Sequence, residues 1–279
     1  MKEFDRAAFE KTRAWVWRNA RPLEIALWRC LFEGGRQEDV VDALAHYQNE
    51  DGGFGHALDP DNWNPASSPY NTHFAIKILR MIGFFDITHP IYQKMFCYLE
   101  HTPHQTALGW KFAIPGNRDY PHAIWWEYEG ARNEIETAGV TAHLCGFILR
   151  YLSHDAPLYA RARQYATGLF APLETETDFG DMGVSGYRVL MADIEAAGMT
   201  RDFACDALWQ FFREKLAAEK EMFEDTEDPL LPEGVWDIPW QWYDGGKYAE
   251  EWAIAKNWWK AHTAIGKLLA IRGAGLLKI

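Results

Sequence analysis

The sequence predicts an all-α protein in which two kinds of helix alternate around a ring, an α/α toroid. Apolar residues recur at helical spacing along most of the chain, as at Leu158, Ala162, Tyr165 and Leu169. Strand signals are nearly absent, and half-apolar segments alternate with segments that are apolar almost all round. This alternation is typical of stacked helical hairpins. We therefore expect residues 1–279 to form a single toroid domain.

The expected helices alternate in order, beginning on the outside of the ring. Outer segments carry one apolar stripe and a polar far side, whereas inner segments have little polar surface. In chain order they span 4–18 (outer), 22–33 (inner), 37–49 (outer), 67–83 (inner), 89–101 (outer), 137–152 (inner), 156–170 (outer), 183–198 (inner), 201–219 (outer) and 250–273 (inner). The 67–83 segment also has Ser67 or Ser68 as a cap and Pro69 at its start.

Composition excludes several classes of protein. The chain has 14 Trp, 16 Phe and 12 Tyr, enough apolar surface to exclude a disordered protein. A net charge of −12 without a basic run argues against a nucleic-acid partner and against anionic lipid. No segment is apolar for the ~18 residues of a membrane span. Four scattered cysteines and a charged N-terminal segment favour a cytoplasmic protein.

The connections between the expected helices differ in length according to their direction. Links from inner to outer helices are short, whereas three links from outer to inner helices, 50–66, 102–136 and 220–249, are long. In a stack of alternating hairpins, links of one direction share one end of the molecule. Binding residues concentrate on such long loops. We therefore expect a site at this end, lined by aromatic and acidic side chains.

A motif closes the outer helix 37–49. Gln48 is followed by Asp51, Gly52, Gly53 and Phe54. This pattern resembles the repeat motif of the squalene-cyclase and protein-prenyltransferase α/α toroids. The resemblance implies that the Gln and the aromatic residue join one hairpin to the next, and it implies an architecture rather than a reaction.

A pair of acids follows in Asp59-Pro60-Asp61-Asn62. The segment resembles, without its final acid, the Asp-x-Asp-Asp motif of proton-initiated terpene cyclases. That resemblance implies a protonated Asp as proton donor. Two carboxyls two residues apart could also form a general acid/base pair. The alternative is a purely structural turn, because Asp-Pro and Asn-Pro are strong turn formers.

Two further loop segments, 117–129 and 234–244, combine aromatic and ionisable side chains. In the 117–129 segment, His122 or Glu127 could transfer a proton. The alternative is a lid packed by its own aromatic residues. We expect substrate-binding residues on both segments and on the acid loop: Trp63, Trp125, Trp126, Trp236, Asp237, Trp240 and Trp242.

No metal or cofactor is expected. The acidic run 224–228 resembles the Asp-Asp-x-x-Asp motif that binds Mg²⁺-diphosphate in terpene synthases, but a solvated loop is the favoured interpretation. The zinc signature Asp-x-Cys of protein prenyltransferases is missing, as are phosphate-binding and dinucleotide-binding glycine motifs. His143, on an inner helix, is interpreted as a core residue.

Three functions remain open. The first is an isoprenoid enzyme related to the terpenoid cyclases and prenyltransferases, and the second is a carbohydrate-active α/α-barrel hydrolase or lyase. The third is a non-catalytic module that binds a small molecule. In an enzyme, we expect Asp59, Asp61, His122 and Glu127 to carry the chemistry. An apolar tunnel more than ~10 Å deep with one polar end would favour the isoprenoid enzyme, whereas an open groove with two facing carboxylates would favour sugar chemistry.

Overall fold

The computed structural model describes residues 3–128, 130–219 and 230–279. These residues form ten α-helices and four very short strands, which confirms the all-α class. The elements are β1 (Phe4–Asp5), α1 (Arg6–Asn19), α2 (Pro22–Phe32), α3 (Gln37–Ala45), α4 (Pro69–Met81), α5 (Pro90–His101), β2 (Gln105–Thr106), β3 (Gly109–Trp110), α6 (Gly130–Tyr151), α7 (Pro157–Leu173), α8 (Gly180–Ala196), α9 (Asp206–Ala218), α10 (Ala249–Gly273) and β4 (Leu277–Lys278). Strand β1 pairs in parallel with β4, and β2 pairs antiparallel with β3.

Local sequence sets the helix boundaries. Proline in the first turn begins α2, α4, α5 and α7. Ser68 caps α4, because its Oγ accepts a hydrogen bond from the Asn71 N–H at 3.0 Å. The largest departure from expectation is α6, which begins seven residues early, at Gly130. The early turns of this helix carry buried polar side chains that form hydrogen bonds. Asn133 accepts from the Ala113 N–H at 2.9 Å, and Glu136 accepts from the Asp181 N–H at 2.8 Å.

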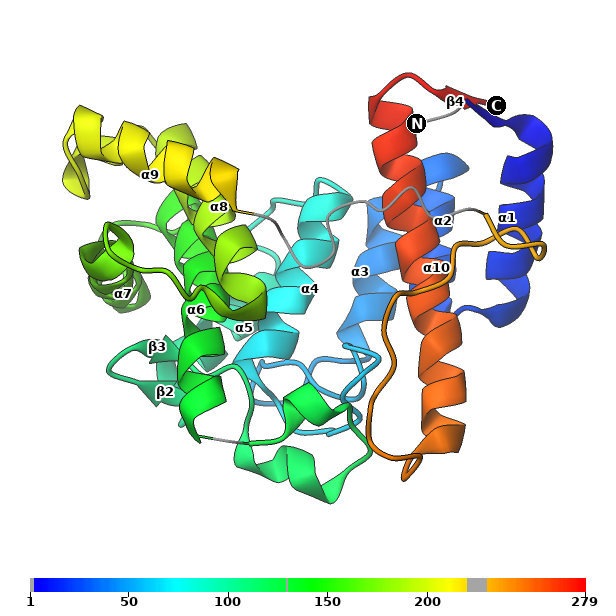
Figure 1. The fold of residues 1–279 in the computed structure, drawn as a ribbon, viewed down its shortest axis with the longest axis horizontal. Coiled ribbons are helices and arrows are strands. Elements are labelled where there is room, and N and C mark those ends of the chain that lie inside the picture. The colour runs from blue at the N-terminus through cyan, green and yellow to red at the C-terminus, as the bar shows by residue number, and fades with distance from the viewer. Residues whose placement is uncertain (1–2, 129, 220–229) are drawn as a thin grey trace.

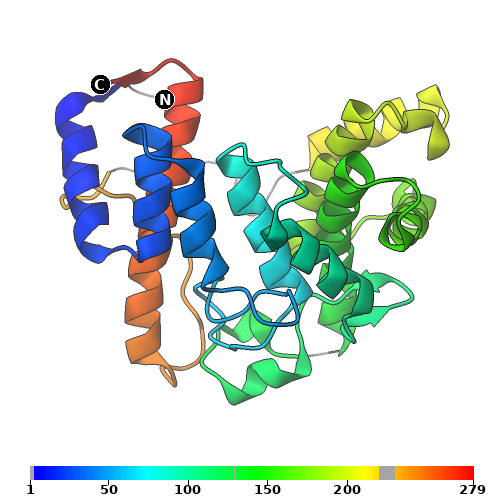
Figure 2. The same cartoon turned by 180° about the vertical axis from the view of Figure 1, so that it is seen from behind.

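The helices pack as consecutive hairpins (Figures 1 and 2). Helix α4 contacts α6 and α6 contacts α8, which gives an inner row, while α5 contacts α7 in an outer row. At the other end, α2 packs against α3 and α10, and α10 also packs against α1. Almost every side chain of α4 is buried or half-buried, and Lys77 is the exception. The alternation of inner and outer helices is thus present along α4 to α8.

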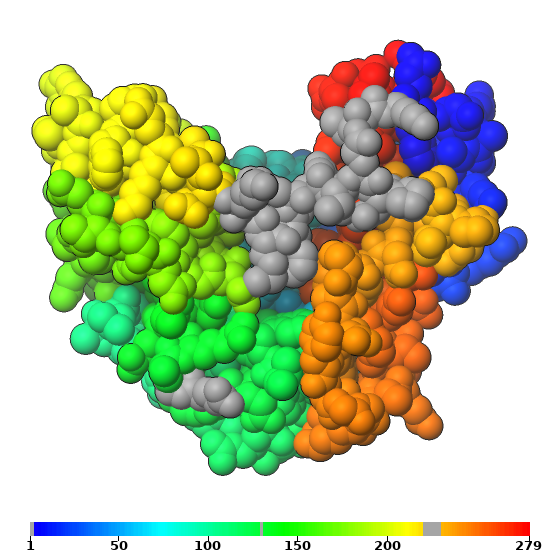
Figure 3. Space-filling view, in the orientation of Figure 1, coloured from blue at the N-terminus to red at the C-terminus, as the bar shows by residue number. Residues whose placement is uncertain are grey.

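Figure 1 shows these helices as an open arc with two arms. Helices α8 and α9 end one arm, α1 and α10 form the other, and α4 lies between them in both ribbon views. Figure 3 shows that the surface is hollowed between the arms. Helix α10 is less enclosed than expected of an inner helix, since its buried residues from Ala261 to Ile271 share one face, and Ala255 is the one other buried residue within Ala249–Gly273. Closure of the arc into a toroid remains a prediction.

The Gln48 motif joins two hairpins. Gln48 Nε2 donates to the carbonyl of Ile91 on α5 at 2.9 Å, and also to that of Gly52 at 2.9 Å. Gly52 has φ +91°, and a Cβ there would lie 2.1 Å from the Lys94 carbonyl oxygen of α5. Phe54 is fully buried beneath this turn. The contact is the one that the toroid resemblance implies, while membership of that family remains a prediction.

None of the helices in the described part of the chain is both long and apolar enough to cross a bilayer.

Candidate functional site

Three connections meet at one end of the arc, at the bottom of Figure 1: the α3–α4 loop, the α5–α6 loop and the segment that leads into α10. Backbone hydrogen bonds join them. The Ala123 N–H donates to the Asp61 carbonyl at 2.9 Å, and the Ile124 N–H donates to the Trp242 carbonyl at 3.0 Å. The α5–α6 loop therefore lies between the other two and holds them together.

Asp59 and Asp61 lie at the centre of this junction, and both are buried. The Asp61 N–H donates to Asp59 Oδ1 at 2.8 Å, and the Asp59 N–H donates to Asn71 Oδ1 on α4 at 3.0 Å. Both oxygens of the Asp61 carboxyl accept from indoles: Oδ1 from Trp242 at 2.6 Å and Oδ2 from Trp240 at 3.2 Å. Two segments about 180 residues apart are thus connected through one carboxyl group.

The surroundings of this pair favour protonated carboxyls. Burial, and then the nearby charge of Asp59, raise the pKa of Asp61 to about 8, although the indole N–H groups oppose the shift. Burial raises the pKa of Asp59 to about 6, opposed by hydrogen bonds from the Asp61 backbone and from Tyr70. Two such close acids titrate as a unit. At neutral pH the pair therefore retains a proton that an exposed aspartate would have lost.

The backbone before the acids is strained and firmly anchored. His56 and Ala57 both have φ of +57°, a left-handed conformation that costs a non-glycine residue about 1–2 kcal/mol. Arg21 holds this turn, because its Nη1 donates to the Ala57 carbonyl at 2.5 Å. The same guanidinium forms a buried ion pair with Glu24 at 2.5 Å and lies 4.9 Å from the Trp258 ring. This anchoring fixes the acid loop against α2 and α10.

Aromatic rings surround the acids. Trp63 stacks on Trp258 of α10, with 5.6 Å between ring centroids, and Trp240 meets Trp259 edge to face at 5.3 Å. Trp259 also lies beside Asp61, although its N–H lies outside hydrogen-bonding geometry. The acid pair is therefore covered on the α10 side by indole rings.

Of the adjacent tryptophans Trp125 and Trp126 in the α5–α6 loop, Trp126 contacts a residue of α4. Trp126 is buried, stacks on Phe112 with 4.4 Å between centroids and meets Tyr70 edge to face at 4.4 Å. Trp125 is only half-buried. Tyr70 thus joins Trp126 to the acid pair.

His122 and Glu127 form a separate pair. The buried His122 ring contacts the Tyr120 carbonyl through Nδ1 at 2.6 Å and Glu127 Oε1 through Nε2 at 3.1 Å. Glu127 keeps 46% of its side chain exposed. Both ring nitrogens of His122 are thus engaged within its own loop, and its hydrogen bonds do not extend to Asp59 or Asp61.

Trp236 and Asp237 lie away from this junction. Trp236 stacks on Phe4 of β1 at 5.4 Å, and Asp237 forms ion pairs with Lys256 and Lys260 of α10 at 3.2 and 3.7 Å. The expectation that Trp236 converges with the acids at one end is therefore wrong. That links of one direction share an end determines where the helices begin and end, but not the path of a long loop. This connection runs along α10 before it reaches the junction (Figure 1).

The structure adds residues that the sequence did not single out as functional. His73 of α4 and His143 of α6 face each other with ring centroids 4.3 Å apart, and His262 of α10 contacts Phe74 at 5.3 Å. Burial lowers the pKa of His143 to about 3 and that of His262 to about 4, and it also strongly lowers that of His73. The available signal was a histidine within a helix that is apolar nearly all round, which also describes a core residue.

Metal ligands do not gather in the described part of the chain, where no three His, Cys, Asp or Glu side chains are placed to hold an ion. The acidic run 224–228 lies outside the described residues.

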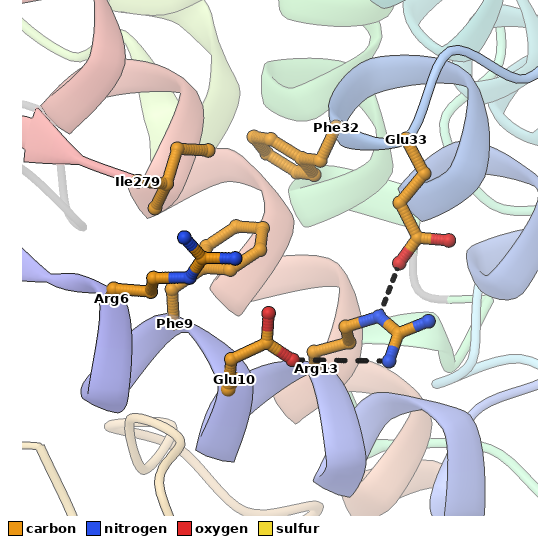
Figure 4. Close-up of a pocket in the computed structure, with 7 residues that line it drawn as sticks. All are labelled: Arg6, Phe9, Glu10, Arg13, Phe32, Glu33 and Ile279. Carbon is orange, nitrogen blue, oxygen red and sulfur yellow. Dashed lines mark hydrogen bonds and ion pairs between the residues drawn. The ribbon is translucent and has the colours of Figure 1, made fainter.

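A separate surface cavity of about 400 Å³ lies between α1, α2 and the C-terminal residue (Figure 4). Three of its charged groups are already paired with one another, because Arg13 binds Glu33 at 2.6 Å and Glu10 at 3.8 Å. The lining contains none of the acids, histidines or tryptophans of the junction; it consists of Arg6, Phe9, Glu10, Arg13, Phe32, Glu33 and Ile279. We therefore place the candidate site at the acid pair and not here.

Comparisons of the chain with protein-family models, with curated proteins and with solved structures found no match.

Proposed function

We propose that the protein is an enzyme that protonates an apolar small molecule of the isoprenoid class, with Asp61 as the proton donor. The observation that carries the proposal is a buried carboxyl with its pKa raised to about 8, bounded by the indoles of Trp240, Trp242 and Trp259. A proton donor at neutral pH needs such a raised pKa. The proposed architecture is an α/α toroid whose centre binds the substrate.

The chemical step requires a donor, a stabilised carboxylate and a surface for positive charge. The Asp61 O–H bond breaks while a C–H bond forms at an alkene carbon, which leaves a carbocation. Trp240 and Trp242 donate hydrogen bonds to the resulting carboxylate. The indole ring of Trp259, which meets Phe74 edge to face with 5.9 Å between centroids, supplies an aromatic surface for the cation. Asp61 is regenerated when the carboxylate takes back a proton from a neighbouring carbon.

The arrangement of acids favours this chemistry over sugar hydrolysis. A glycosidase needs two carboxyls on opposite sides of the bond that it cleaves, roughly 5–10 Å apart. Asp59 and Asp61 instead share one loop, and the backbone of one donates to the carboxyl of the other. Tyr70 and Asn71 contribute further hydrogen bonds to Asp59, which acts as a positioning residue for Asp61.

Deuterium uptake tests the proposal directly. Farnesol, geranylgeraniol and squalene are incubated separately with the protein in D₂O, and product mass is measured. Protonation of an alkene places one deuterium on carbon. We expect Asp61→Asn to reduce uptake about 100- to 10,000-fold, the usual range for loss of a general acid.

The matched control is Asp237→Asn, which removes an acid that lies on the same connection as Trp240 but pairs with Lys256. It should keep uptake at the level of the unmodified protein. Circular dichroism establishes that both variants are folded. Undiminished uptake in Asp61→Asn, or hydrolysis of oligosaccharides by a protein that deuterates no polyprene, would contradict the proposal.

A further inference from the structure

The indole N–H of Trp259, on α10, has no hydrogen-bond acceptor in the described part of the chain, although its nitrogen atom is buried. An indole nitrogen can only donate, so this hydrogen-bonding capacity is unused. A buried donor without a partner costs free energy and calls for an explanation. Because Trp259 belongs to the aromatic surroundings of the acid pair, Asp61 is a candidate acceptor.

Ring contacts hold Trp259 against this carboxyl group. Trp240, which donates to Asp61 Oδ2 at 3.2 Å, meets the Trp259 ring edge to face with 5.3 Å between centroids. Phe74 of α4 meets the same ring edge to face at 5.9 Å. Burial raises the pKa of Asp61, and Trp259 is one of the three indoles that oppose this shift. The Trp259 N–H is therefore near Asp61 but outside hydrogen-bonding geometry.

The hydrogen-bonding needs of Asp61 change when it gives up its proton. A protonated carboxyl uses one oxygen as a donor, whereas a carboxylate has about four acceptor positions on its two oxygens. In the structure, Oδ1 accepts from Trp242 and Oδ2 accepts from Trp240. A third indole N–H is therefore surplus to the neutral acid, but it can stabilise the anion.

We infer that Trp259 donates a third hydrogen bond to Asp61 once that carboxyl is ionised, and so stabilises the conjugate base that forms during proton transfer. A bond made only to the charged form accelerates the step, because it is stronger in the transition state than in the ground state. Burial of the site strengthens such a bond to a charged oxygen. The catalytic consequence rests on the proposed function, whereas the hydrogen bond itself requires only that Asp61 ionises.

Replacement of Trp259 by benzothienylalanine tests this hydrogen bond, because that residue keeps the shape of the indole but has sulfur in place of the N–H group. Infrared spectroscopy follows the protonated carboxyl of Asp61 as the pH rises, and the band that is lost in Asp61→Asn identifies it. We expect the ionisation midpoint of Asp61 to rise by about one pH unit, since the charged form loses a donor. Deuterium uptake should fall by up to about tenfold, the ratio that one pKa unit represents.

The other groups that act on this carboxyl are unchanged by the replacement. The charged and titratable groups around Asp61 and Trp259 are Arg21 and Glu24 at the start of α2, Asp59 on the acid loop, Tyr70 and Lys77 of α4, and His262 of α10. Since these side chains and the shape of the ring are all retained, a raised midpoint reports the missing N–H group.

The matched control places benzothienylalanine at Trp209, a buried indole of α9 that donates to a different carboxylate, Glu195, at 2.8 Å. It should leave the midpoint of Asp61 and the deuterium uptake unchanged. Trp259→Phe is a second variant that lacks the N–H group, and it should raise the midpoint as well. A midpoint that stays the same or falls in both Trp259 variants overturns the inference.

The two proposals fail in different ways. A raised midpoint in a protein that deuterates no polyprene retains the hydrogen bond and rejects the reaction. Uptake that is lost in Asp61→Asn, together with an unshifted midpoint in the Trp259 variants, retains the reaction and rejects the hydrogen bond.

Discussion

Two buried histidines of this protein have opposite hydrogen-bonding environments. Both ring nitrogens of His122 are engaged, by Tyr120 and Glu127, whereas those of His73 have no partner in the described part of the chain. A buried polar group stabilises a fold only when its bonds are made. A buried polar group without partners lowers stability.

The two histidines should therefore respond differently to replacement by leucine. We expect His73→Leu to raise the free energy of unfolding by about 1 kcal/mol, because it removes an unpaired polar group from the interior. His122→Leu should lower it by about 1–3 kcal/mol, because it leaves the Tyr120 carbonyl unpaired. Urea denaturation measures both values. A loss of stability in His73→Leu as large as that in His122→Leu would show that His73 has a structural role.

At the scale of elements, the turn after α3 depends on a close approach between backbones. Gly52 is the residue at which a side chain would meet the carbonyl of Lys94, whereas Gly198, at φ +70°, has nothing within 4 Å of an added Cβ. Both glycines adopt positive φ, so they share the conformational cost of alanine. They differ only in the contact between hairpins.

That difference can be measured with a pair of variants. Gly198→Ala should lower the free energy of unfolding by about 1 kcal/mol, the cost of the left-handed backbone. Gly52→Ala should cost about 3 kcal/mol or more, since α5 must also move away. Guanidinium denaturation of both proteins provides the comparison. Equal losses would mean that the α3–α5 contact adjusts freely.

The sequence predicts the helices well, because the spacing of apolar residues within each segment is enough to show which of its faces is buried. It also predicts the meeting of the acid loop with Trp240 and Trp242, because the connections share one end of the hairpins. It fails for Trp236, whose position depends on the path of a long loop. It does not single out Tyr70, His73 and Trp259, because a polar residue on a buried face shows its role only once the neighbouring helices are in place.

For the whole molecule, buried ionisable groups set the dependence of stability on pH. The native pKa values of Asp59 and Asp61, about 6 and about 8, exceed the unfolded value near 4, so their contribution is lost as pH rises through this range. The pKa values of His73, His143 and His262 are lowered, so the unfolded chain binds extra protons below about pH 6.5. Stability from the histidines is therefore lost as pH falls.

These opposing effects predict a maximum of stability near pH 6. Between about pH 6.5 and 8 the free energy of unfolding should fall by about 1–2 kcal/mol, the contribution of one proton held by Asp61. Asp61→Asn should flatten the profile in this interval and leave the acid limb unchanged. Thermal melts across buffers of equal ionic strength provide the measurement. A flat profile above pH 6.5 in the unmodified protein would refute the raised pKa of Asp61.

The packing of α10 against α1 and α2 has a consequence for the order of folding. Thr12 donates to the Gly234 carbonyl at 2.5 Å across 222 residues of chain, and Arg272 donates to the Leu31 carbonyl at 2.5 Å across 241. Contacts this distant carry the greatest entropic cost of loop closure, whereas neighbouring hairpins such as α6–α7 need only short closures. During synthesis, the middle hairpins can therefore assemble first. We expect the apolar face that α1 and α2 present to α10 to stay uncovered until α10 has been synthesised.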